Sequence, residues 1–248
     1  MLPAVLALLL LWSPLQNERV EYLISQLTQH GFSLREAEAL LHDPRLKVYP
    51  PRTVQPREVQ WDQVIARLVA PESVRQGSRF LIQHQESLSR AEKEFGVARE
   101  VLAAIVRVES NFGQNAGRYI TFNVFYTSLL RSAEEKRWKW AAENLVSLAA
   151  YCKAAGTDCF RIRGSYAGAL GPAQFLPRSL QEHGYDGNGD NLVDPFDIED
   201  ALFSAANFLI QNGWREDPLG ALGKYYGSAA GYPRAVLAYA EALGMPSR

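Results

Sequence analysis

Apolar and polar residues alternate with helical period along most of the 248-residue chain. Residues 17–41 show this period with a break at Gly31, after which Ser33 and Glu36 have the spacing of a capping box that opens a second helix. Further helices are expected at residues 71–96, 137–155 and 198–214, at the end of the chain, and over the stretch after residue 100 that carries Glu109 and ends about one turn past it. No set of alternating strands is found, so the pattern predicts a mainly α protein.

Two kinds of stretch interrupt these helices. Pro50, Pro51 and Pro56 exclude regular helix from an extended segment before residue 61. The C-terminal stretch from Gly220 is interpreted as a tyrosine-bearing loop followed by a closing helix.

The N-terminus is apolar from Leu2 to Trp12, which is too short to span a bilayer but suits the apolar part of a secretory signal. Residues 1–16 are therefore predicted to be a signal peptide or an apolar N-terminal segment, in a protein without an integral membrane span. The alternative is an N-terminal helix that packs on the domain.

Composition is that of an ordinary globular protein, with 47% hydrophobic and 21% charged residues. A net charge of -1 gives no reason to expect nucleic acid or an anionic membrane as a partner. Cys152 and Cys159 match no common metal motif. They are expected to form a local disulfide in an exported chain, or to be two buried free thiols.

Glu109 is the most unusual residue of the helical pattern. In a helix it shares one face with Leu102, Ile105 and Phe112, which are large and apolar. Desolvation raises the pKa of a carboxyl, and a carboxyl that stays protonated near neutral pH is a competent general acid. The sequence SNFG that follows should end the helix and place Glu109 at the lip of a cleft. The alternative is a buried glutamate paired with an Arg or with backbone amides.

A glycine-rich stretch, GSYAGALGPAQFLP at residues 164–177, offers the neutral donors and acceptors that sugar recognition needs. The candidates are Ser165, Tyr166 and Gln174. The alternative is a tight loop in which packing requires the glycines.

An acidic loop at residues 186–197 has the spacing of a calcium-binding EF-hand loop. Its candidate ligands are Asp186, Asn188, Asp190, Leu192 through its carbonyl, Asp194 and Asp197. Asn191 stands where the motif has Gly, and Asp197 where it has Glu. The alternative is a solvated turn that caps the helix beginning at Ile198.

Four motifs occur together in one order: IVRVESNFG, GSYAGALGPAQFLP, DGNGDNLVDPFDIEDALFSAANFL and KYYGS. In this they resemble the lytic murein transglycosylase B family over about residues 20–245. The resemblance implies a lysozyme-like helical core with an inserted EF-hand-like loop. It also implies an N-terminal helical region at residues 17–75 and a catalytic domain at residues 76–248.

The resemblance further implies that Glu109 is the single catalytic acid and base. The enzyme would cleave the β-1,4 bond between N-acetylmuramic acid and N-acetylglucosamine of peptidoglycan and leave 1,6-anhydro ends. No cofactor is needed for this chemistry, and calcium would be a structural ion. The implied substrate-binding residues are Ser165, Tyr166, Gln174, Phe208, Tyr225 and Tyr226. Phe208 stands where the family often has Tyr, and Tyr226 where it often has Asn.

Two other functions remain open at this point: a muramidase-type hydrolase on the same fold, and a non-catalytic peptidoglycan-binding protein. A hydrolase would need a second carboxylate to activate water, and the motifs offer no clear candidate. In each case we expect a monomeric, exported protein of the periplasm or cell envelope whose partner is the peptidoglycan glycan strand.

Overall fold

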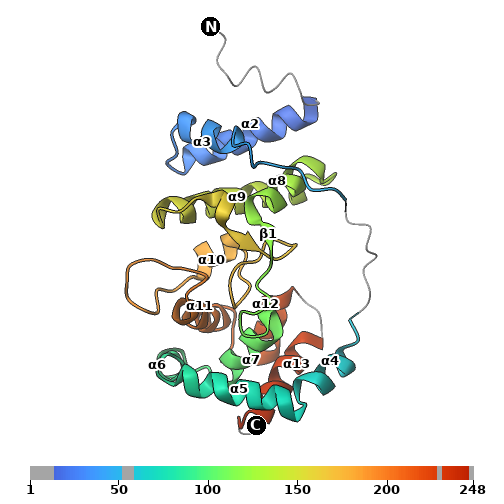
Figure 1. Cartoon of the computed structure of the whole chain (residues 1–248), viewed down its shortest axis with the longest axis vertical. Helices are drawn as coiled ribbons and strands as arrows, with labels where there is room; N and C mark the ends of the chain where they lie inside the picture. Colours follow the sequence, from blue (N-terminus) through green and yellow to red (C-terminus); the bar gives the residue numbers. More distant parts are fainter. Residues whose placement is uncertain (1–13, 52–58, 228–230, 246–248) are drawn as a thin grey trace. The chain divides into compact units, whose positions relative to one another are not determined.

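The fold is mainly helical, as the sequence predicts (Figure 1). A computed structural model describes residues 14–51, 59–227 and 231–245. Within these ranges the only strands are β1 (Tyr119–Ile120) and β2 (Arg163–Gly164), an antiparallel pair in which Tyr119 faces Gly164. No helix in the described ranges is both long and apolar enough to cross a membrane. Most of the predicted signal segment, residues 1–13, lies outside them.

The chain divides into two compact units, neither of which is continuous in sequence. The first comprises residues up to 52, 117–169 and 176–178. The second comprises residues 53–116, 170–175 and 179–248. The predicted division into residues 17–75 and 76–248 is contiguous and stays a prediction.

The first unit is built from α2 (Pro14–Gln29), α3 (Leu34–Leu41), α8 (Thr121–Arg131) and α9 (Glu135–Ala154). Helix α2 packs on α9 and α8 (Figure 1). The predicted capping box is confirmed, because the Ser33 amide donates to the Glu36 carboxylate (2.6 Å) and the Glu36 amide donates to Ser33 Oγ (3.2 Å). A disulfide joins Cys152 and Cys159, which confirms the first of the two alternatives for these residues.

The second unit surrounds a central helix, α7 (Arg99–Ser110). The other helices of this unit are α4 (Trp61–Leu68), α5 (Pro71–Gln83), α6 (Gln85–Phe95), α11 (Ile198–Gln211), α12 (Pro218–Tyr226) and α13 (Gly231–Ala242), and most of α10 (Pro177–His183) belongs to it. Helices α5, α6, α11 and α13 all pack on α7, and residues 101–106 of α7 have no exposed surface. A helical segment that is apolar on all sides, as residues 101–106 are, belongs at the centre of a fold; the last turn of the same helix carries Glu109.

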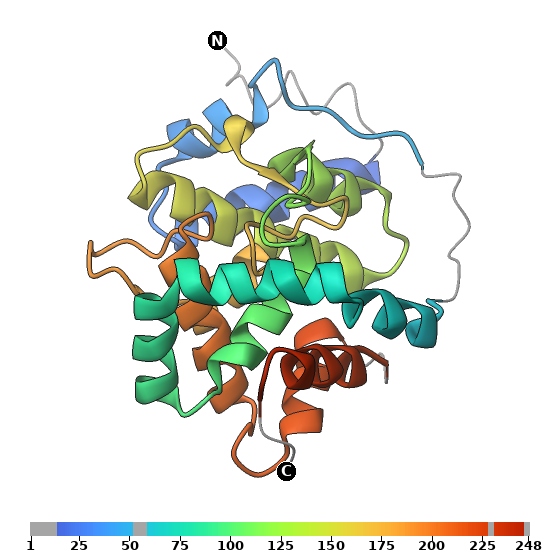
Figure 2. The ribbon, with the colours of Figure 1, turned by 60° about the horizontal axis from the view of Figure 1, so that its bottom comes forward.

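The single helix expected at residues 71–96 is two helices. His84 ends α5 and begins α6, and Figure 2 shows α6 turning steeply away from α5. Neither Pro nor Gly marks the junction in the sequence. The turn brings Phe80 and Leu88 into one core, so tertiary packing decides the break.

Helix α12 corrects a second expectation, because the stretch from Gly220 is not simply a loop. The Asp217 side chain accepts the Gly220 amide (2.9 Å), and Pro218 occupies the first helical turn. Both are helix-start signals. Gly220 and Gly223 disfavour a helix, so the sequence did not predict one here despite these signals.

Candidate active site

Glu109 lies in the last turn of α7, next to the final residue Ser110. The helix ends there because Asn111 (φ 53°), Phe112 (φ 57°) and Gly113 (φ 81°) all take the left-handed conformation. Leu102 and Ile105 are fully buried on the predicted face. Phe112 is not on that face; its ring stacks on Phe80 instead, with 4.6 Å between ring centres.

Ser110 fastens this turn to the glycine-rich stretch. Its buried hydroxyl donates to the Pro172 carbonyl (2.6 Å) and accepts the Gly113 amide (2.8 Å). The Gln174 side-chain amide donates to the carbonyls of Ala116 (3.2 Å) and Gly171 (2.8 Å). Gln174 therefore holds the same two turns together, and only its side-chain oxygen remains for a substrate. Sequence reasoning did not single out Ser110, whose partners are distant in the chain.

Gly171 shows why glycine is required in this stretch. Its φ is +66°, and a Cβ there would lie 1.7 Å from the Pro195 carbonyl oxygen. Any side chain would force the turn away from residue 195. The packing alternative therefore explains this glycine.

The Glu109 carboxyl lies among tyrosines. Burial raises its pKa to about 7, and a polar interaction with the Tyr232 hydroxyl opposes the rise. The Tyr232 hydroxyl makes no regular hydrogen bond to any described residue. The Tyr225 hydroxyl donates to the Ala173 carbonyl (2.8 Å), and burial together with the Glu109 charge raises the pKa of both tyrosines.

This environment suits a proton donor. Desolvation outweighs the tyrosine interaction, so a large fraction of Glu109 is protonated near neutral pH. Among the described residues, no second carboxylate shares in setting this pKa. Tyr232 was missed in the sequence because it opens the closing helix and has the character of a core residue.

The first unit holds Ser165 and Tyr166. Ser165 Oγ accepts the backbone amides of Ala169 (3.0 Å) and Ala167 (3.3 Å), so its hydroxyl hydrogen remains to be donated. The Tyr166 side chain is 62% exposed. Both residues can offer hydrogen-bonding groups to a sugar.

The remaining aromatic candidates differ in exposure. Tyr226 is 45% exposed, and its ring stacks on Tyr232 at 4.7 Å. Phe208 is only 9% exposed and packs edge-on against Phe175 and Tyr225. The Tyr226 side chain is thus accessible to a ligand, whereas we expect Phe208 to support Tyr225 from the core.

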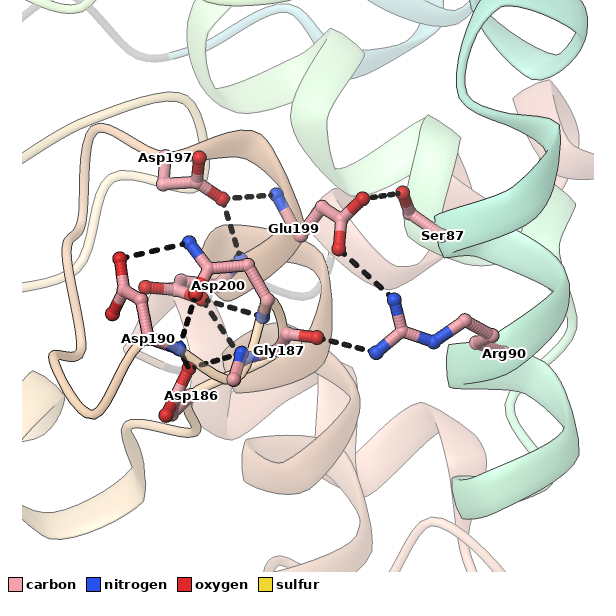
Figure 3. A network of polar contacts seen from close by, with 10 residues as sticks. Ser87, Arg90, Asp186, Gly187, Asp190, Asp197, Glu199 and Asp200 are labelled. Carbon is pink, nitrogen blue, oxygen red and sulfur yellow. Dashed lines mark hydrogen bonds and ion pairs between the residues drawn. The ribbon is translucent and has the colours of Figure 1, made fainter.

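The carboxylates of the acidic loop accept backbone amides of the loop itself (Figure 3). Asp186 accepts from Gly189 (2.7 Å) and Asn191 (2.8 Å). The Asp190 carboxylate accepts the Leu192 amide, and the Asp194 carboxylate accepts the Phe196 amide. The Asp190 amide in turn donates to the side-chain oxygen of Asn188. Asp197 accepts from Glu199 and Asp200 as the cap of α11, which is the alternative expected for this loop. No three His, Cys, Asp or Glu side chains of the described residues gather closely enough to hold a metal ion.

Asp200 is the carboxylate that organises this loop, and the twelve-residue spacing did not include it. Its buried Oδ1 accepts from Gly187 (2.8 Å) and Asn188 (3.3 Å), and its Oδ2 accepts from Asp194 (2.7 Å) (Figure 3). Burial raises its pKa against these hydrogen bonds. Arg90 of α6 adds a bond to the Gly187 carbonyl (2.6 Å).

Three proteins that are similar to this chain in sequence or structure carry the name lytic transglycosylase. Membrane-bound lytic murein transglycosylase B of Escherichia coli K12 is 25% identical over 239 residues, 92% of this chain. The chain spans 62% of the length of that relative. Soluble lytic transglycosylase SltB1 of Pseudomonas aeruginosa has a TM-score of 0.77 at 23% identity, covering 90% of this chain and 97% of its own.

A third protein is the E. coli lytic transglycosylase Slt35, solved in complex with calcium. It has a TM-score of 0.77 at 19% identity, covering 92% of this chain and 93% of its own. These likenesses confirm the lysozyme-like helical fold. The sequence profile of the family described as the transglycosylase SLT domain matches residues 16–223. The match extends over well more than half of the chain, and the protein therefore belongs to the transglycosylase SLT domain family.

Proposed function

We propose that the protein is a lytic transglycosylase that cleaves the β-1,4 bond between N-acetylmuramic acid and N-acetylglucosamine in peptidoglycan. The observation that carries this proposal is the Glu109 carboxyl: burial raises its pKa to about 7, and no other carboxylate among the described residues contributes to that shift. The names of the similar proteins support the same reaction. One carboxyl that can both give and take a proton is what this chemistry requires.

Glu109 first donates its proton to the glycosidic oxygen, and the bond from that oxygen to C1 of the muramyl sugar breaks. The substrate's acetamido group shares the positive charge that develops at C1. The Glu109 carboxylate then accepts the proton of the muramyl C6 hydroxyl while O6 attacks C1. The ring closes to a 1,6-anhydro end, Glu109 is protonated again, and no water is consumed.

A tethered nucleophile explains the single acid. Inverting and retaining hydrolases use a second carboxylate to activate water or to form a covalent intermediate. The C6 hydroxyl is already part of the substrate, and well-oriented intramolecular groups reach effective concentrations of about 10⁵–10⁸ M. We propose that Ser165, Tyr166, Gln174, Tyr225 and Tyr226 hold the glycan, and that Tyr232 and Ser110 hold Glu109 and the turn that follows it.

Activity of the Glu109→Gln variant tests the assignment of the acid. We expect it to lose the ability to clear a suspension of purified cell walls. The matched control is Glu86→Gln, because Glu86 is exposed on α6. Equal clearing by the Glu109 variant and the wild type would refute a catalytic role for this residue.

We further propose that the acidic loop binds calcium as a structural ion. Its donors are oxygen atoms, which calcium prefers, and the similar E. coli Slt35 was solved with calcium. Because Asp197 caps α11, the carboxylate best placed to close the loop is Asp200. Metal binding would require the loop carboxylates to exchange some amide contacts for the ion.

The melting temperature with calcium and with chelator tests this proposal. We expect calcium to raise it for the wild type and for Asp197→Asn, but not for Asp186→Ala or Asp200→Asn. A wild-type melting curve that chelator leaves unchanged would contradict a calcium site.

We also propose that the chain is exported to the cell envelope and acts there as a monomer. The substrate is located in the envelope, and the Cys152–Cys159 disulfide is typical of an oxidising compartment. Fractionation of cells that express the full chain, followed by thiol alkylation, tests this. Cytosolic protein with two alkylated cysteines would contradict it.

A further inference from the structure

A pocket of about 560 Å³ opens beside the turn that follows Glu109. Its floor is aromatic: Phe112 stacks on Phe80 with ring centres 4.6 Å apart, and the His84 ring lies 4.5 Å from Phe80 on α5. Pro172, whose carbonyl binds Ser110, also lines the pocket. The pocket therefore borders both turns that position Glu109.

The walls of this pocket are polar and carry positive charge. Gln76, Arg79 and Gln83 come from α5, and Gln114 comes from the turn, where its oxygen accepts from Asn111 (2.7 Å). Among the described residues that line the pocket, none is Asp or Glu. Such walls match a ligand that carries carboxylates and amide groups.

Arg79 is the cation of the pocket and is only weakly engaged elsewhere. It lies 3.4 Å from Glu72 in an exposed pair, and pairs of this kind contribute little. Glu72 is already bound by Arg75 through bonds of 3.0 and 2.5 Å. The Arg79 side chain is 70% exposed, so its guanidinium is accessible to a ligand.

Contacts with neighbouring side chains fix the position of the Phe112 ring in the pocket. Phe112 has left-handed backbone (φ 57°), which is unfavourable for a non-glycine residue and persists only where the surroundings enforce it. Here Arg107 enforces it: its guanidinium donates to Ser73 Oγ (3.1 Å) and to Asn111 Oδ1 (2.5 Å), and lies 5.9 Å from the centre of the Phe112 ring. The helix end that carries the acid thus also presents an aromatic ring to the pocket.

We propose that this pocket binds the stem peptide of the peptidoglycan strand, with Arg79 pairing with a peptide carboxylate. The glutamines would bind the peptide amides, and the ring of Phe112 would pack against the aliphatic part of the peptide. This proposal rests on the proposed function, because the stem is attached to the muramic acid whose C1 lies at Glu109 during cleavage. The pocket would make the enzyme prefer strands that carry peptides.

Kinetics with two substrates test the pocket. The substrates are purified glycan strands with their stem peptides, and the same strands after an amidase has removed the peptides. Arg79→Gln is compared with wild type and with Arg67→Gln, a control at an exposed arginine of α4 that does not line the pocket. For Arg79→Gln we expect KM to rise about 3- to 10-fold on peptide-bearing strands, with kcat unchanged and no change on stripped strands.

Each other outcome overturns the proposal. An unchanged KM on peptide-bearing strands would show that Arg79 does not bind the peptide, and an equal rise on both substrates would indicate a sugar subsite instead. Isothermal titration of the amidase-released stem peptide into wild type and Arg79→Gln gives an independent result, with weaker binding expected for the variant. Wild type that forms no anhydro ends on either substrate would refute the proposed function, while the titration still decides whether the pocket binds peptide.

Discussion

Replacing Glu109 with glutamine should change how the free energy of unfolding depends on pH. The fold raises the pKa of this carboxyl from its ordinary value of 4.5 to about 7, chiefly by burial. The folded state therefore binds the Glu109 proton more tightly than the unfolded state. The resulting stabilisation is complete below about pH 4.5 and is lost as pH rises through 7.

The size of the effect follows from the pKa change. At about 1.4 kcal/mol for each pH unit, a rise from 4.5 to about 7 corresponds to about 3 kcal/mol. Because the side chain keeps some exposed surface, we expect about 2–3 kcal/mol between pH 4 and pH 8. Glutamine cannot ionise, so Glu109→Gln should lack this loss and gain stability relative to wild type as pH rises.

Urea unfolding followed by circular dichroism, at intervals from pH 4 to pH 8, measures the difference. Glu86→Gln is the control, because its carboxylate is exposed, and its stability should follow that of wild type. A difference between Glu109→Gln and wild type that stays constant over this range would refute a burial-raised pKa.

Three further changes test the interaction of Tyr232 with the acid, the turn at Gly171 and the disulfide of the first unit. Tyr232→Phe removes the hydroxyl that lowers the Glu109 pKa, so the alkaline limb of the pH–activity profile should move up by as much as about one pH unit; a limb that moves down would contradict the inferred interaction. Gly171→Ala places a methyl group 1.7 Å from the Pro195 carbonyl oxygen, and thermal unfolding should show a large loss of stability; an unchanged melting temperature would show that the turn is not confined there. Replacing Cys152 and Cys159 together with serine should lower the urea-unfolding free energy by about 2 kcal/mol, and equal stability of the two proteins would count against the disulfide.

The features that sequence predicted are those that neighbouring residues determine. The period of α7 marked Glu109 as an acid on an apolar face, and the structure buries Leu102 and Ile105 on that face. The Ser33–Glu36 capping box depends on a spacing of three residues and was equally visible.

The features that sequence missed depend on contacts between distant residues. Ser110 donates to the Pro172 carbonyl, and Tyr232 interacts with Glu109. Both pairs are far apart in the sequence, so a pattern of neighbouring residues cannot predict them. The break at His84 follows from packing, since neither Pro nor Gly marks it.

In the acidic loop, the twelve-residue EF-hand spacing omits a carboxylate that the structure shows to be important for the loop. The spacing ends at Asp197, whose carboxylate caps α11. The carboxylate that closes the loop is Asp200, and it is buried because it lies on the inner face of that helix, where three loop amides donate to it.

The most direct test of the account is the chemistry of the cut ends. Purified peptidoglycan is digested with wild type and with Glu109→Gln, and the products are analysed by mass spectrometry. We expect wild type to produce muramic acid ends lighter by one water, the 1,6-anhydro form, and the variant to produce none. Reducing muramic acid ends produced by the wild type would show that water is the nucleophile and would contradict the account.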